Sequence, residues 1–178
     1  HRIGNISGRY GVQYYFDYPD TEKPLMRVIM ISPNHRIGAT SPGTGERYIY
    51  EPGSTYYNWV VSAIDTARAK QIPWIITGMH YPCISIGHGS DCDSDHNQTA
   101  PPLFNLLVEK KVDLILQGHR HLYERSKQLK HSANCPVVRA GVYYPNCISD
   151  SGTDNLYSKG NGPVVAIIGT AGGTMSGI

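Results

Sequence analysis

The sequence lacks several features that would assign the protein to a class at once. No apolar run approaches the roughly 18 residues of a membrane-spanning helix, so we expect no membrane span. No sign of charge dominates either, because the formal net charge is +2, which is too small to favour nucleic acid or an anionic membrane as a partner. There is no initiator Met and no signal peptide before His1. We therefore expect a mature or cleaved product, or part of a longer chain.

The residues that are present describe an ordinary globular protein. Its 178 residues, 40% of them hydrophobic and 17% charged, are enough for one domain with a sizeable core. Thirteen Tyr against two Phe, with 19 Gly and 12 Pro, indicate a loop-rich surface of the extracellular kind. We expect residues 1–178 to form a single domain, which the motifs described below indicate to be incomplete.

The cysteines and two glycosylation motifs favour a secretory compartment. No cysteine stands in a Cys-x-x-Cys motif, which argues against a zinc ribbon. Four cysteines permit three pairings, and their clustering favours two local disulfides. The favoured pairs are Cys83 with Cys92 and Cys135 with Cys147. Asn5 and Asn97 begin Asn-x-Ser/Thr motifs, and with the paired cysteines they predict a secreted, glycosylated, extracellular protein.

Hydrophobic patterning predicts an α/β chain. Short apolar runs indicate strands at 14–18, 25–32, 73–77, 112–116 and 163–168, with a weaker candidate at 137–140. An apolar stripe at helical spacing predicts a helix that Ser54 or Thr55 caps and that ends near Lys70. A second helix is predicted over 101–111, and residues 33–53 are expected to form a long surface loop. The order of strand, helix and strand from residue 73 to 116 predicts a βαβ unit with parallel strands.

Histidines follow two of these strands. His80 comes after the run 73–77, and His119 and His121 come after the run 112–116. Ligands gather at the carboxyl ends of parallel strands, and residues two apart on a strand face the same side. We therefore expect the three imidazoles to converge on one metal site, with Gly118 allowing a sharp backbone turn. A solvated loop is the alternative for an isolated His-x-His, and for His35 a solvated imidazole is the expected state.

Three segments occur in this order: 74–80, ending in Gly-Met-His; 112–125, containing Gly-His-Arg-His-Leu-Tyr-Glu-Arg; and the glycine-rich 169–173, which lacks the Gly-Lys-Ser/Thr ending of a P-loop. Together they resemble the calcineurin-like metallophosphoesterases. The similarity is greatest to the secreted, purple-acid-phosphatase-like branch and covers roughly residues 14–130. It implies an αββα sandwich with mixed sheets and βαβ units, and a site of two metal ions. In that site a hydroxide bridging the metals attacks a phosphate ester.

The resemblance also implies roles for individual residues. His80 and His119 would ligate one metal ion and His121 the other, and imidazole suits Zn, Fe or Mn. His88 and His96 lie in a loop where related phosphatases place histidines that bind phosphate or protonate the leaving group, although a surface imidazole is the alternative for each. The Tyr-Glu-Arg part of the motif is expected to serve packing and ion pairing.

The sequence departs from the family at its carboxylate motifs. It contains no early Asp-x-His, no Gly-Asp-x-x-Asp or -Tyr and no Gly-Asn-His-Glu or -Asp, which supply the bridging aspartate and the remaining ligands in the family. We therefore expect this chain to be the C-terminal part of a domain whose N-terminal half is missing and acts as its partner. The complete domain would be a phosphoric ester hydrolase, and this chain alone would be inactive. The main alternative is a non-catalytic extracellular structural or binding protein on a degenerate form of the same fold; a weaker one is a single structural zinc site.

Overall fold

The computed structural model describes residues 5–33, 35–37, 45–86, 100–139, 141–171 and 174. Its strands are β1 Ser7–Arg9, β2 Gln13–Tyr18, β3 Met26–Ile31, β4 Arg36–Ile37, β5 Glu46–Arg47, β6 Trp74–Met79, β7 Leu114–Gln117, β8 Tyr123–Arg125, β9 Gln128–Leu129, β10 Ile148–Asp150 and β11 Val164–Ile168. Its helices are α1 Thr55–Ala69, α2 Ala100–Glu109 and the short 3₁₀ helix η1 Pro145–Cys147. No helix among the described residues is long and apolar enough to span a membrane.

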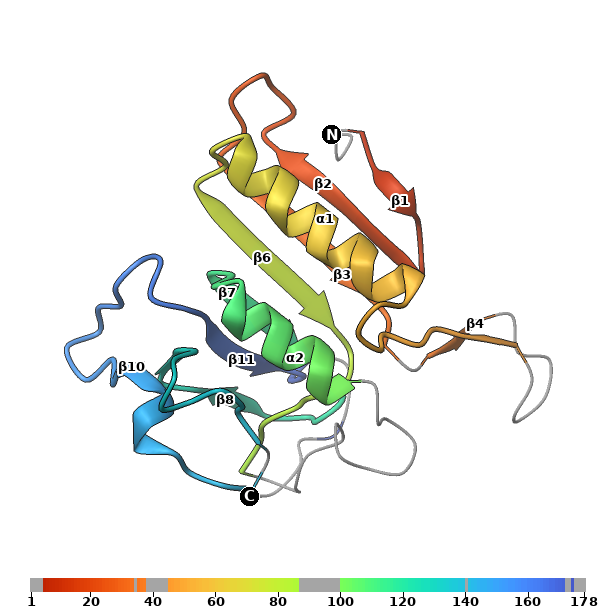
Figure 1. Cartoon of the computed structure of the whole chain (residues 1–178). Helices are drawn as coiled ribbons and strands as arrows, with labels where there is room; N and C mark the ends of the chain where they lie inside the picture. The colour runs from red at the N-terminus through yellow and green to blue at the C-terminus, as the bar shows by residue number, and fades with distance from the viewer. Residues whose placement is uncertain are drawn as a thin grey trace.

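Seven strands form one mixed sheet in the order β1-β2-β3-β6-β7-β11-β8 (Figure 1). The central strands β3, β6, β7 and β11 run parallel to one another. The flanking strands β2 and β8 pair antiparallel with their neighbours. The predicted βαβ unit is confirmed as β6-α2-β7, and α1 joins β3 to β6 in a second unit. The α/β class and the mixed sheet are therefore as the sequence predicted.

Both long helices cover the same face of the sheet. Successive parallel strands are added in one direction across the sheet, so right-handed crossovers place α1 and α2 on one side. Figure 1 shows α1 over β2 and β3, and α2 over β7 and β11. On this face Ile29, Ile75 and Ile115 are fully buried and form the centre of the core.

Helix α1 forms where its capping residue and apolar stripe predict it. Ser54 Oγ accepts a hydrogen bond of 3.2 Å from Tyr57 N, which satisfies one of the free amides of the first turn. Val60, Ile64 and Ala67 on its inner stripe are fully buried. Fully burying a side chain such as Val60 or Ile64 stabilises the fold by about 1.5–3 kcal/mol.

The opposite face of the sheet is apolar but only partly buried. Its side chains alternate with the buried ones, as a strand requires. They include Met26, Val28, Ile76, Leu114 and Leu116, all of intermediate exposure, and Trp74, which is 46% exposed. Parallel sheets normally have both faces covered. Within the described part of the chain, one helix layer covers one face, which accounts for half of the expected four-layer sandwich.

Three expectations about the loops differ from the structure. The segment 33–53 contains the short antiparallel pair β4 and β5. Residues 137–139, part of the weak strand candidate, are not in a strand. Strands β1, β8, β9 and β10 were not predicted, because runs of two or three residues are too short to show a period.

Candidate functional site

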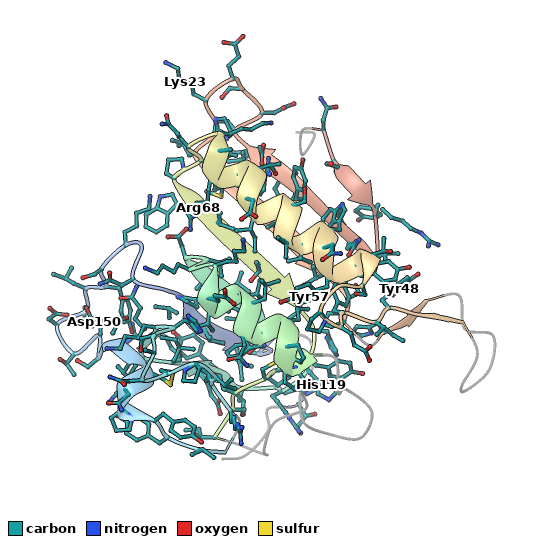
Figure 2. All side chains as sticks on the ribbon, viewed as in Figure 1. Lys23, Tyr48, Tyr57, Arg68, His119 and Asp150 are labelled. Atoms are coloured by element: carbon teal, nitrogen blue, oxygen red, sulfur yellow. A yellow bond between two sulfur atoms is a disulfide. The ribbon has the colours of Figure 1, made fainter. Side chains whose placement is uncertain are left out.

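Three histidines stand at the carboxyl ends of three adjacent parallel strands. His35 follows β3, His80 follows β6 and His119 follows β7. Two hydrogen bonds join the ends of β6 and β7, from Gly118 N to His80 O at 3.0 Å and from Gln117 Nε2 to Tyr81 O at 3.2 Å. Figure 2 labels His119 at this rim, and Lys23 marks the opposite end of the molecule. His80 and His119 are both exposed, so the rim is open to a ligand.

The imidazoles of His80 and His119 point their nitrogens at each other. His80 Nε2 lies 3.0 Å from His119 Nδ1, and the ring centroids are 4.9 Å apart at an interplanar angle of 73°. Two nitrogens that each lie about 2.0–2.1 Å from one cation, at angles from octahedral to tetrahedral, are about 2.9–3.4 Å apart. A hydrogen bond between the rings also satisfies this distance. The pair therefore has the spacing of two adjacent ligands of one metal ion.

In the described part of the chain, His80 and His119 are the side chains whose spacing suits a metal ion. There, no group of three or more His, Cys, Asp or Glu side chains is arranged to hold an ion. His121 has its Nδ1 2.9 Å from Thr174 O. The described residues thus offer two converging imidazoles and a third whose Nδ1 is bonded to the backbone.

The His-x-His segment is a turn and not an extension of the strand. Strand β7 ends at Gln117, and His119 adopts a left-handed backbone with φ of 61°. Residues 119 and 121 are therefore not on a strand. The prediction that strand alternation directs both imidazoles to one side is wrong. The turn is made at His119 and not at Gly118, because Gly118 has no positive φ and an added Cβ there would lie an ordinary 3.7 Å from His80 O.

A different glycine supports this turn. A Cβ at Gly169, which follows β11, would overlap the carbonyl oxygen of Arg120. Gly169 therefore allows a close backbone approach behind the His119–His121 turn.

His35 was expected to be solvated, and the structure places it in this cluster. Its ring stacks on Tyr81 with centroids 5.0 Å apart and an interplanar angle of 18°, and it lies 5.3 Å from the ring of His80. Burial, and then the nearby His119, lower the pKa of His35 below its ordinary value. The sequence carried a signal for this position, because His35 also comes just after a predicted strand, 25–32.

Glu124 of the Tyr-Glu-Arg string holds the loop that follows β6. Its carboxylate accepts hydrogen bonds from Ser85 Oγ and from Ile86 N, each at 3.2 Å. The side chain of Arg125 lies over the ring of Tyr157 at 5.3 Å. Glu124 and Arg125 of this string thus make hydrogen bonds and a ring contact within the fold.

Other candidate residues divide between described and undescribed parts. The Cys135–Cys147 disulfide is present as predicted. Cys83 is disulfide-bonded too, and its expected partner Cys92 lies outside the described residues. His88, His96 and Asn97 also lie outside them. Asn5 is exposed, as a glycosylation site requires.

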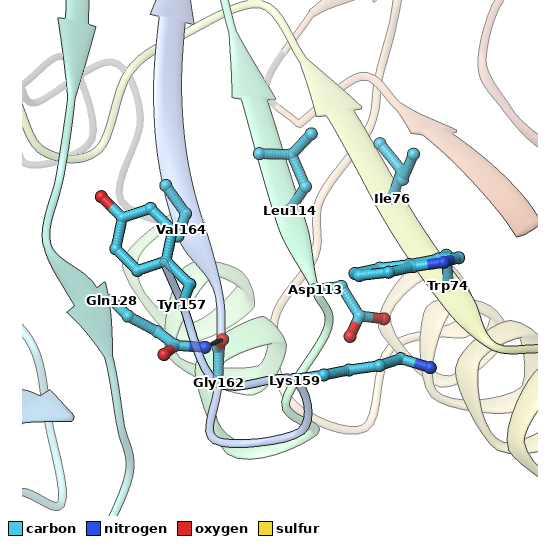
Figure 3. A pocket seen from close by; sticks show the side chains of 9 residues that line it. All are labelled: Trp74, Ile76, Asp113, Leu114, Gln128, Tyr157, Lys159, Gly162 and Val164. Carbon is cyan, nitrogen blue, oxygen red and sulfur yellow. Dashed lines mark hydrogen bonds between the residues drawn. The ribbon is translucent and has the colours of Figure 1, made fainter. Parts of the chain in front are cut away.

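A pocket of about 340 Å³ lies at the other end of the strands (Figure 3). It is lined in part by the first residues of three strands, Trp74, Leu114 and Val164. Its polar groups are engaged within the fold: Asp113 Oδ2 accepts from Ile75 N at 2.8 Å, and Gln128 Nε2 donates to Gly162 O at 2.8 Å. The histidine rim is therefore the better candidate for a site that binds a polar ligand.

Sequence comparison relates the chain to plant acid phosphatases. It is 29% identical over 114 residues to a protein named probable purple acid phosphatase 20 from Arabidopsis thaliana, a match that covers 64% of this chain and 26% of that protein. It is 31% identical over 80 residues to purple acid phosphatase 21 of the same plant, covering 45% of this chain and 18% of that protein. No family model matches the sequence.

Structure comparison gives the same relationship at the level of the fold. A purple acid phosphatase from yellow lupin (Lupinus luteus) seeds superposes with a TM-score of 0.56 at 17% sequence identity, covering 93% of this chain and 24% of that chain. The chain thus spans about a quarter or less of the length of these relatives.

Proposed function

On the premise that this chain is a calcineurin-like metallophosphoesterase related to the purple acid phosphatases, we propose that it acts in a metal-dependent phosphoric ester hydrolase. The site contains two metal ions, and this chain supplies the histidine ligands. His80 and His119 hold one ion and His121 helps to hold the other. When bound, the cations polarise the phosphoryl group and activate the attacking water.

The observation that carries this proposal is the 3.0 Å approach of His80 Nε2 to His119 Nδ1 at an exposed strand rim. Neutral imidazole is a ligand for zinc, iron and manganese, so the pair is compatible with each of these ions. The two hydrogen bonds between the ends of β6 and β7 fix the backbones that carry the rings. The site therefore has its two histidines positioned before an ion binds.

The hydrogen bond of His121 supports its role as a separate ligand. Because a backbone carbonyl can only accept, Nδ1 of His121 must donate its proton to Thr174 O. In the neutral ring this leaves the lone pair on Nε2. A metal-binding histidine commonly has this arrangement, in which an outer carbonyl fixes the tautomer.

The remaining ligands come from a partner segment that this chain does not contain. A dinuclear site needs carboxylates, and the motifs that supply them in the family are absent from the sequence. The partly buried apolar face of the sheet, with Val28, Ile76 and Leu116, offers the surface on which a second sheet packs. The missing N-terminal half of the domain is the proposed partner, and this chain alone is inactive.

We also propose that the substrate is a phosphate ester and that the protein is secreted. His88 and His96 remain candidates for binding the substrate or protonating its leaving group. The Cys135–Cys147 disulfide and the disulfide-bonded Cys83 suit an oxidising compartment. Glycosylation at Asn5 and Asn97 would accompany secretion.

The test measures bound metal and the hydrolysis of p-nitrophenyl phosphate in the intact protein that contains this chain. The proposal expects two metal ions per protein, and a loss of both activity and about one ion in His119→Ala. The matched control is His131→Ala, which changes an exposed histidine outside the cluster. Intact protein without bound metal or hydrolytic activity would overturn the proposal and favour a non-catalytic role. Hydrolysis by the purified 178-residue chain, abolished by His119→Ala, would show that activity does not depend on a partner segment.

A further inference from the structure

We propose that His35 binds the substrate in this site by donating a ring N–H to a phosphoryl oxygen. The inference rests on the proposed function, because it takes a phosphate ester as the ligand. It adds to the site a residue from a third strand end that lies outside the histidine motifs.

The backbone of His35 is anchored on both sides. Its amide donates to Ser32 O at 3.3 Å, and its carbonyl accepts from Tyr48 N at 3.3 Å. Tyr48 is fully buried, so the second bond ties His35 to the hydrophobic core. A residue in a solvated loop would not need this support. The position of the ring is therefore set by the fold before any ligand binds.

The ring of His35 is held by aromatic contacts that leave its nitrogens available. It stacks on Tyr81, and the same tyrosine lies 4.8 Å from the ring of His119 and 5.0 Å from that of His80. Its own distance to the His80 ring is 5.3 Å. Within the described residues, no hydrogen bond involves either ring nitrogen of His35. The rings of His35, Tyr81, His80 and His119 thus form one cluster. Among the described residues, the ring N–H of His35 has no acceptor.

His35 is better suited to the substrate than to the metal. His80 and His119 approach each other through their nitrogens, whereas His35 meets His80 edge to face through the rings. The described residues also contain no group of three side chains arranged to hold an ion. A phosphate ester held at the His80–His119 pair has oxygens that face away from the cations. A fixed donor beside the pair can stabilise the charge on such an oxygen.

The experiment compares three variants of the metal-loaded intact protein: His35→Ala, His35→Gln and the control His131→Ala. The first readout is the dissociation constant of inorganic phosphate from isothermal titration calorimetry. A hydrogen bond to a charged group is worth enough that His35→Ala should weaken phosphate binding by about tenfold or more. Gln keeps an N–H donor of similar reach, so His35→Gln should recover most of the affinity. Bound metal should stay at the wild-type level in all three variants.

The second readout separates this inference from the proposed function. Kinetics with p-nitrophenyl phosphate should show a higher KM in His35→Ala and wild-type values in His131→Ala. Loss of metal in His35→Ala would make His35 a ligand and overturn the inference. Phosphate affinity in His35→Ala equal to that of His131→Ala would overturn it as well, while leaving the hydrolase proposal intact. A wild-type protein without metal and activity would overturn both.

Discussion

Gln117 Nε2 donates a hydrogen bond of 3.2 Å to Tyr81 O and thereby ties the end of β7 to the loop after β6. Gln117 is 2% exposed, and its Oε1 has no hydrogen-bond partner in the described part of the structure. His80 and Tyr81 follow β6, and Gly118 and His119 follow β7. The bond therefore lies beside both proposed ligands. It links the two strand ends that carry them.

Replacing Gln117 by Met should loosen the metal pair without removing a ligand. Met keeps the side-chain volume but removes the bond to Tyr81 O, at a cost of about 0.5–1.5 kcal/mol in unfolding free energy. We expect bound metal to fall at limiting metal concentration and to recover at saturating concentration. Urea unfolding and metal titration measure the two effects. Metal binding that stays at the wild-type level at every concentration would show that the bond does not position the pair.

The Glu124 carboxylate should control the mobility of the loop after β6. Glu124→Gln weakens hydrogen bonds that a charged acceptor makes to Ser85 Oγ and Ile86 N. Hydrogen exchange at the Ile86 amide should therefore become faster in this variant. The control is Tyr123→Ala, because Tyr123 is the neighbouring residue and is 62% exposed. Equal exchange in the two variants would contradict the role given to Glu124.

The sequence predicted the elements with strong local patterns. Helix α1 followed from the Ser54 cap and a helical stripe, and β3, β6 and β11 followed from apolar runs. The place of His35 did not follow, because it depends on β3 lying next to β6 in the sheet, a contact between distant segments. The left-handed backbone of His119 was also missed, since a non-glycine residue rarely adopts it and the preceding Gly118 offered a simpler explanation.

Removing the guanidinium of Arg27 should strongly destabilise the protein. Arg27 is fully buried and makes two hydrogen bonds to the carboxylate of Asp17, at 2.6 and 2.7 Å, and a third to Ala63 O at 2.8 Å. Arg27→Met leaves Asp17 without its partner in a largely buried position, which costs about 3–5 kcal/mol. Urea unfolding measures this change.

An exposed ion pair provides the comparison for Arg27. Lys110 and Asp65 lie 2.8 Å apart, with side chains that are 30% and 53% exposed. Lys110→Ala should therefore cost no more than about 1 kcal/mol. The double variant Arg27→Met, Asp17→Leu should recover much of the lost stability, because it removes both buried charges together. If the double variant is as unstable as Arg27→Met alone, the lost stability comes from packing and not from the unpaired carboxylate.

Alanine should be harmful at one of two glycines near the proposed metal pair and tolerated at the other. A Cβ at Gly169 overlaps the carbonyl oxygen of Arg120, so Gly169→Ala must displace the backbone between His119 and His121. A Cβ at Gly118 meets His80 O at 3.7 Å, an ordinary contact, so Gly118→Ala should leave that backbone in place. In the intact protein, Gly169→Ala should lower both bound metal and phosphatase activity, while Gly118→Ala should stay near the wild type. Because Gly118 is the glycine inside the histidine motif, a larger loss in Gly118→Ala than in Gly169→Ala would show that the motif glycine, and not the approach of Gly169 to Arg120, shapes the turn.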